Sequence, residues 1–184
     1  MAAQGGLASW ATSCGRARAK GMTTPDLAVL LRRAGFQVTA LRRTARQFAF
    51  SAAATLAEGL RSENPYISWA SAVGLSELGF SAVPALARAL RDHSARVRRD
   101  AVLTLGRLGP AATGAVGDIT RALRDHAPHV RKAAARALAD LGPAARKSIP
   151  ALAAALRAKD RDLRDAAAYA LGRIGRALSS QTSR

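Results

Sequence analysis

A repeat with a period of 33 residues is the feature of this sequence that most constrains its fold. Each copy carries a Leu-Arg pair, in most copies an Asp, and then a Val-Arg or Leu-Arg pair, in the segments 90–98, 123–131 and 156–164. Eight residues after each Val or Leu begins a second signature that closes with a glycine, in the segments 105–109, 138–142 and 171–175. A weaker fourth copy runs from Leu60 to Gly79. Two linked signatures that recur together indicate a chain built from similar structural units.

Each copy predicts a pair of helices. In the third copy, Val116, Ile119 and Leu123 follow one another at spacings of three and four, which places them on one face of a helix. The same spacings then mark a second helix, whose apolar positions are Val130, Ala134, Leu138 and Leu141.

Glycine and proline mark the ends of these predicted helices. A glycine stands just past the last apolar position of each second helix, where a left-handed backbone would end the helix, at Gly79, Gly109, Gly142 and Gly175. Pro110 and Pro143 follow two of these glycines and prevent the helix from continuing. Pro84 and Pro150 fall in the predicted first turn of the first helix. Every copy is therefore expected to read helix, turn, helix, stop.

Helix pairs of this kind must stack, because a lone pair of amphipathic helices cannot bury its apolar face. The predicted fold class is therefore all-α, with successive units about 10 Å apart around a continuous core. The chain contains 45 alanines in 184 residues, which fits close approach of antiparallel helices and fits GC-rich coding equally well.

The pattern resembles that of the HEAT-like repeats first described in phycobilin lyases. Its elements are matched at Leu90, Asp92, Val97, Arg98, Leu105 and Gly109, and the later copies depart only at Ala158 and Arg176. The resemblance covers about residues 48–178 and implies a right-handed α-solenoid of about four two-helix repeats with a degenerate N-terminal helical cap. It does not specify a function, because HEAT-like repeats occur in scaffolds, adaptors, lyases and a few enzymes.

The composition argues against several other classes of protein. Aromatic residues make up only 4% of the chain, which disfavours a β-sandwich or barrel. The single Cys14 excludes a disulfide scaffold. No apolar run approaches the roughly 18 residues of a membrane span. A helical chain with a formal net charge of +17 remains.

The first 23 residues form a basic, acid-free arm that contains Arg16, Arg18 and Lys20. Such a composition resembles an organelle transit sequence and predicts a mitochondrial or plastid protein. The alternatives are a flexible basic arm or an expression artefact, in which case a cytoplasmic location is expected.

The remaining chain is expected to divide into a cap, four repeats and a tail. Residues 24–47 resemble a degenerate helical cap, with Arg42, Arg43 and Arg46 predicted to face solvent. The repeats are predicted at 48–79, 80–112, 113–145 and 146–178, followed by a polar tail at 179–184.

The resemblance places the second helix of each unit on the concave side, where partners bind. Side chains two, six and ten residues after each Val or Leu are predicted to turn away from the core, and the candidate partner-binding set is Trp69, Arg99, Leu103, Lys132, Arg136, Tyr169 and Arg173. This surface is mixed in sign, whereas a nucleic-acid groove should be more uniformly basic. A protein partner anchored by Trp69 and Tyr169 is therefore favoured. In the alternative interpretation, Trp69 only packs into the next unit or the cap.

Two further sets of arginines recur in register. One set occupies the convex side at Arg61, Arg91, Arg124 and Arg157, where it contacts phosphate or an acidic partner, or else complements the negative end of each first helix. The basic residues of the arm and cap are candidates for the same contacts. The other set takes the internal ladder position of the family, at Arg98, Arg131 and Arg164, and is expected to pair with Asp92, Asp125 or neighbouring acids.

No catalytic group, metal site, cofactor or small-molecule substrate is expected. His93 and His126 are predicted to lie one repeat apart, and no Cys or further His joins His126 and His129. Cys14 has no nearby base. The sequence thus favours a non-catalytic scaffold or adaptor, as an accessory subunit of a larger organellar assembly, including one that contains RNA. The alternative is direct RNA binding through the basic arm and the convex arginines.

Overall fold

The computed structural model describes residues 38–182, with side chains described for residues 46–180. The chain divides into two compact units, residues 1–47 and 48–184. The predicted arm with Arg16, Arg18 and Lys20 lies outside the described residues, as do the side chains of Arg42 and Arg43.

The described chain consists of helices and the turns between them. Their order is α3 (Val38–Gly59), α4 (Pro65–Glu77), η1 (Gly79–Ala82), α5 (Val83–Ala89), α6 (Ala95–Leu108), η2 (Gly109–Ala115), α7 (Val116–Ala122), α8 (Pro128–Leu141), η3 (Gly142–Ser148), α9 (Ile149–Ala155) and α10 (Arg161–Thr182), where η marks a 3₁₀ helix. The α-helices form the pairs α3/α4, α5/α6, α7/α8 and α9/α10, which confirms the prediction of an all-α solenoid of four two-helix repeats. Helix α3 crosses residue 47 and α10 crosses residue 178 without a break.

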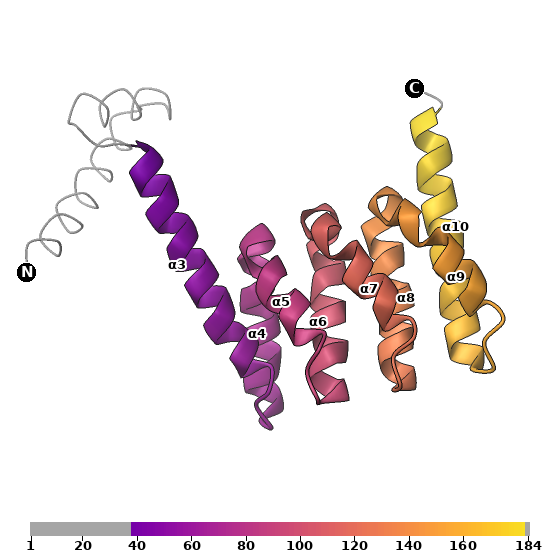
Figure 1. Ribbon diagram of the computed structural model, residues 1–184, viewed down its shortest axis with the longest axis horizontal. Coiled ribbons are helices and arrows are strands. Elements are labelled where there is room, and N and C mark those ends of the chain that lie inside the picture. Colours follow the sequence, from indigo (N-terminus) through magenta and orange to yellow (C-terminus); the bar gives the residue numbers. More distant parts are fainter. Residues whose placement is uncertain (1–37, 183–184) are drawn as a thin grey trace, which may run out of the picture. The chain divides into compact units, whose positions relative to one another are not determined.

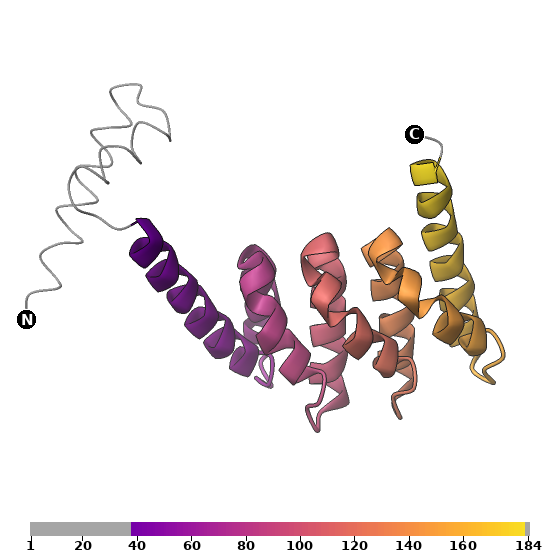
Figure 2. The ribbon, with the colours of Figure 1, turned by 45° about the horizontal axis from the view of Figure 1, so that its top comes forward.

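The repeats place their helices in two layers. Helices α4, α6, α8 and α10 follow one another side by side, and α5, α7 and α9 lie across them in the second layer (Figures 1 and 2). Helix α6 packs against α4 and α8, and α8 packs in turn against α10. Each second helix therefore has one face covered by a first helix and an opposite face that no other helix of residues 38–182 covers.

The predicted apolar positions form the core. In the third repeat, Val116, Ile119 and Leu123 of the first helix are buried, as are the apolar positions of the second helix, Val130, Ala134, Leu138 and Leu141. All but Val130 belong to one hydrophobic cluster that extends from Ala53 to Ile174. This burial confirms the predicted register of the helices.

Small residues bring neighbouring second helices close together. A Cβ atom added to Gly106 in α6 would lie only 2.9 Å from Cα of Ala137 in α8. Five alanines of α8 are buried among the leucines of that helix, namely Ala133, Ala134, Ala135, Ala137 and Ala139. Close packing of α6, α8 and α10 thus depends on side chains no larger than a methyl group at these positions.

Three of the four predicted glycine stops have a positive φ, at Gly79 (57°), Gly109 (54°) and Gly142 (56°). At Gly109, ψ is −130°, so the backbone lies in the mirror image of the extended region, which only glycine adopts readily. The prediction for Gly175 is wrong, because α10 continues through it to Thr182. Arg176 stands there in place of a proline, so no missing N–H group interrupts the helix. Continuation of the helix also lets Leu178 pack against the core.

The sequence analysis missed the 3₁₀ helices η1, η2 and η3, which precede α5, α7 and α9. Pro110 and Pro143 occupy the first turn of η2 and η3, and Pro84 and Pro150 occupy the first turn of α5 and α9 as predicted. Each of these first α-helices is consequently only seven residues long. Within residues 38–182, no helix combines the length and the apolarity needed to cross a bilayer.

Candidate partner-binding surface

Helix α4 exposes more large apolar side chains than the other second helices do, namely Tyr66, Ile67 and Trp69 against Tyr169 of α10. From Pro65 to Ser76 it contains no charged residue, whereas α6, α8 and α10 carry charged residues opposite their buried faces. Tyr66 is 81% exposed and Trp69 is 65% exposed. A helix that is apolar on every side is normally enclosed, so the open face of α4 is suited to a contact with another molecule.

A cleft of about 260 Å³ opens between the exposed faces of α4 and α6, and Trp69 and Leu103 form part of its lining. The basic side chains around them belong to Arg96, Arg99 and Arg107. Arg99 donates two hydrogen bonds, of 2.9 and 2.7 Å, to Asp100, also in the lining. The cleft thus combines an exposed indole with three arginines against two acids, Glu63 and Asp100. It forms one end of the second-helix surface, which consists of the candidate partner-binding residues Trp69, Arg99, Leu103, Lys132, Arg136, Tyr169 and Arg173.

A second cleft, of about 510 Å³, lies between α8 and α10 and includes Tyr169, Lys132 and Arg136. Its three acids are Asp140, Asp162 and Asp165. The Lys132 ammonium forms an ion pair with Asp162 and lowers the pKa of that carboxyl. At the same end of the surface, Arg173 donates a long hydrogen bond of 3.4 Å to the Tyr169 hydroxyl.

The candidate partner-binding residues therefore divide between two clefts. Trp69, Arg99 and Leu103 line the first, and Lys132, Arg136 and Tyr169 line the second. The first carries more basic than acidic side chains, and the second contains three aspartates. A partner that covers both would meet opposite charge at its two ends.

A ladder of arginines joins successive repeats. Nε and Nη2 of Arg98 donate to the two carboxylate oxygens of Asp125 over 2.7 and 2.8 Å, and Nη1 donates to the carbonyl oxygens of Asp92 and His93. The side chains of Arg98 and Asp125 are only 15% and 12% exposed. The hydrogen bonds from Arg98 lower the pKa of Asp125. The pair therefore fixes the turn of the second repeat against the turn of the third.

The same arrangement recurs one repeat further along the chain. Arg131 donates to the carbonyl oxygens of Asp125 and His126, each over 3.0 Å, and to the carboxylate of Asp160 over 3.1 Å. Arg164 in the last repeat donates to two carbonyl oxygens of its own turn. These three guanidinium groups are thus engaged within the fold.

The first repeat departs from this scheme, because Ser68 stands where the others have the ladder arginine. Arg96 of the next repeat reaches back and donates to Oγ of Ser68 and to the carbonyl oxygens of Arg61 and Ser62. The carboxylate of Asp92 accepts a 2.7 Å hydrogen bond from Arg61 and not from Arg98. The sequence analysis missed Arg96, although the serine at the ladder position was the available signal.

The four convex arginines lie in unequal surroundings. Arg61 pairs with Glu58 and Asp92. Arg91 has a side chain that is 74% exposed and lies 3.9 Å from Asp118. Arg124 and Arg157 are exposed as well. These arginines occupy equivalent positions in the repeats, but they do not have equivalent acidic partners.

The residues considered for metal binding or catalysis are the three histidines and Cys14. His93, His126 and His129 are exposed, and Cys14 lies outside the described residues. Within the described part of the chain, no group of three or more His, Cys, Asp or Glu side chains is placed to hold a metal ion.

Comparison with known families identifies the class of protein. Residues 53–116 and 111–172 match a family described as HEAT repeats, which accounts for more than half of the chain. The chain belongs to this family. No curated protein sequence matches it significantly.

Solved structures show the same architecture. The complex of CpcE and CpcF of phycocyanin lyase from Nostoc sp. PCC7120 is similar with a TM-score of 0.59 and 25% identity, over 73% of this chain and 90% of that one. An engineered protein matches with a TM-score of 0.52 and 20% identity, over 71% of this chain and 67% of that one. A designed armadillo repeat protein in complex with the peptide (KR)4 gives 0.52 and 17%, over 66% of this chain and 63% of that one. The last two similarities concern the fold alone.

Proposed function

We propose that this chain is a non-catalytic scaffold or adaptor that binds a protein partner through the second-helix surface. In this proposal, it is an accessory subunit of a larger organellar assembly, with or without an RNA component. Trp69 and Tyr169 anchor the partner, and the charged residues of the two clefts orient it.

The observation that carries the proposal is an exposed aromatic side chain in each cleft. Trp69 is 65% exposed and Tyr169 is 52% exposed, and each lies beside charged groups that can fix the direction of a polar contact. Large aromatic side chains surrounded by polar ones are the usual energetic centres of protein interfaces. The structural neighbour from Nostoc is itself a complex of two proteins, CpcE and CpcF, which supports a contact between protein chains.

Replacing Trp69 by alanine should weaken binding of the partner about tenfold or more, because a central aromatic anchor contributes about 2 kcal/mol or more. The measurement is the dissociation constant of the partner recovered with the tagged wild-type chain, determined by calorimetry for each variant.

Phe80→Ala is the matched control, since Phe80 is 63% exposed but belongs to η1 and not to a second helix. Its affinity for the partner should equal that of the wild type. Equal affinities for wild type and Trp69→Ala would refute the anchoring role of the indole.

Direct RNA binding is the second candidate function, and the exposure of Arg91, Arg124 and Arg157 favours it. If phosphate contacts carry this binding, the affinity for a single-stranded RNA should fall at least about tenfold between 50 and 200 mM salt. Filter binding across that range of salt measures the slope. An affinity that does not change with salt contradicts direct RNA binding.

A further inference from the structure

A third cleft, of about 620 Å³, opens between α7 and α9 at the end where each first helix turns into the second. Four alanines line one side of it, namely Ala151, Ala154, Ala155 and Ala158. Arg124, His126 and Lys159 are the groups around it that carry or can take a positive charge outside the arginine ladder. None of the residues of the second-helix surface lines this cleft.

Comparison with the preceding repeat shows which residue differs at this cleft. Counting back 33 residues places Ala151 at the position of Asp118, and Arg124 at that of Arg91. In the preceding repeat, Asp118 pairs with Arg121 of its own helix and also lies 3.9 Å from Arg91, so α7 presents a carboxylate within ion-pair range of the arginine of the repeat before it. In the third cleft an alanine replaces that carboxylate, which removes both the acid and its volume.

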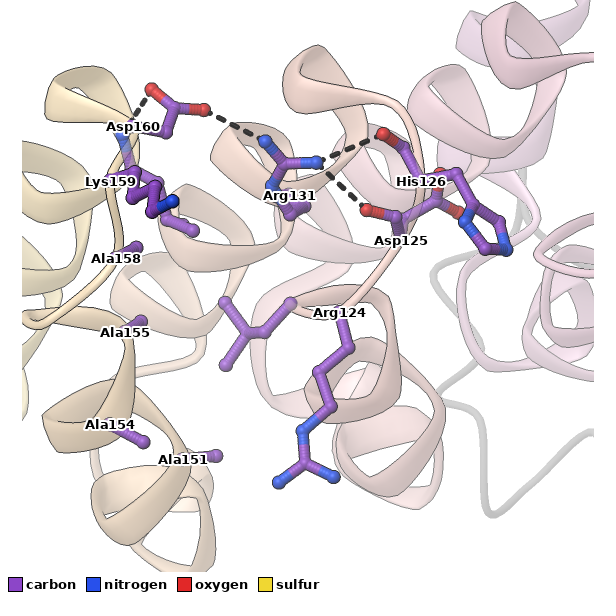
Figure 3. Close-up of a pocket in the computed structure, with 12 residues that line it drawn as sticks. Arg124, Asp125, His126, Arg131, Ala151, Ala154, Ala155, Ala158, Lys159 and Asp160 are labelled. Carbon is purple, nitrogen blue, oxygen red and sulfur yellow. Dashed lines mark hydrogen bonds and ion pairs between the residues drawn. The ribbon is translucent and has the colours of Figure 1, made fainter.

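Arg124 is left without an acidic partner among residues 46–180. The two acids in the cleft are already engaged, because Asp125 pairs with Arg98 and Asp160 pairs with Arg131. Figure 3 shows the Arg124 side chain extending away from this hydrogen-bonded network, towards the level of Ala151 and Ala154.

We propose that the third cleft binds a carboxylate side chain of an acidic protein segment, which pairs with Arg124 at the place that Asp118 occupies one repeat earlier. Lys159 provides a second positive charge at the rim. A carboxylate fits better than a phosphate or a nucleic acid, because the lining has only one more basic side chain than acids, with Arg124, Arg131 and Lys159 against Asp125 and Asp160. The site goes beyond the proposed function, since it uses none of the residues of the second-helix surface.

The test is fluorescence anisotropy of a labelled peptide of alternating glutamate and alanine, titrated with the full chain. Arg124→Ala removes the charge, and Ala151→Asp restores the acid of the preceding repeat within the chain itself. Each variant should lower the affinity about fivefold, the size expected for the loss of one exposed ion pair.

Arg91→Ala is the matched control, because it changes the net charge by the same amount at the equivalent position and should alter the affinity less than about twofold. The peptide with glutamine in place of glutamate should not bind. The proposal is overturned if Arg91→Ala weakens binding as much as Arg124→Ala, or if Ala151→Asp leaves the affinity unchanged. It is also overturned if an RNA or a phosphopeptide binds more tightly than the glutamate peptide in a way that Arg124→Ala abolishes.

Discussion

Replacing Leu138 by alanine should lower the free energy of unfolding by about 2 to 5 kcal/mol, because truncating a buried leucine leaves a cavity. Leu138 is fully buried in α8, and α8 packs against both α6 and α10. The loss therefore affects the contacts of a central helix on both of its sides. Urea unfolding followed by circular dichroism measures the effect.

Leu156→Ala is the matched control for this experiment. The side chain of Leu156 is 39% exposed, so its truncation should cost less than about 1 kcal/mol. An unchanged melting temperature for Leu138→Ala would mean that the register of the second helices is wrong.

Replacing Asp125 by alanine should cost about 2 to 4 kcal/mol, because the substitution leaves the largely buried Arg98 guanidinium without its carboxylate. Asp165→Ala is the control, since the Asp165–Arg161 pair is solvent-exposed and is worth less than about 1 kcal/mol. Equal losses in the two variants would contradict a structural role for the ladder.

The dependence of stability on pH provides a second test of the Arg98–Asp125 pair. The pKa of Asp125 is lower in the folded chain than its ordinary value, so the stabilisation is complete above about pH 4 and is lost as the pH falls through the folded-state pKa. Between about pH 5 and pH 3, Asp125→Ala should therefore lose less stability than the wild type. If the free energy of unfolding falls equally in the wild type and in Asp125→Ala, groups other than Asp125 cause the loss of stability in acid.

The sequence alone predicts the repeat architecture because each unit is defined by local signals. Apolar spacing identifies α7 and α8. Gly109 ends α6 and Gly142 ends α8, as the pattern predicts. The failure at Gly175 has a local cause too: Arg176 follows it instead of a proline, and Leu178 beyond it packs against the core, whereas Gly79 ends its helix with no proline after it. The 3₁₀ helices were missed because they bury too few residues to show a period.

The surroundings of the charged residues could not be predicted to the same extent. Arg61, Arg91 and Arg124 look equivalent in the sequence, yet two of them have acidic partners from another helix or turn and the third has none among the described residues. Such differences depend on which side chain the next repeat presents, as with Asp118 and Ala151. Likewise, the candidate partner-binding residues were predicted to form one surface, but six of the seven divide between two clefts in the structure, and Arg173 lines neither of them.

Density-gradient sedimentation of a native extract tests the central claim most directly. We expect the wild-type chain to sediment with a larger assembly, to remain bound to a protein partner after nuclease treatment, and to be released by the combined Trp69→Ala and Tyr169→Ala substitutions. Phe80→Ala should sediment like the wild type. A wild-type chain that stays at the top of the gradient, or whose sedimentation is unaffected by the loss of both aromatic side chains, would contradict the assignment of this surface to a protein partner.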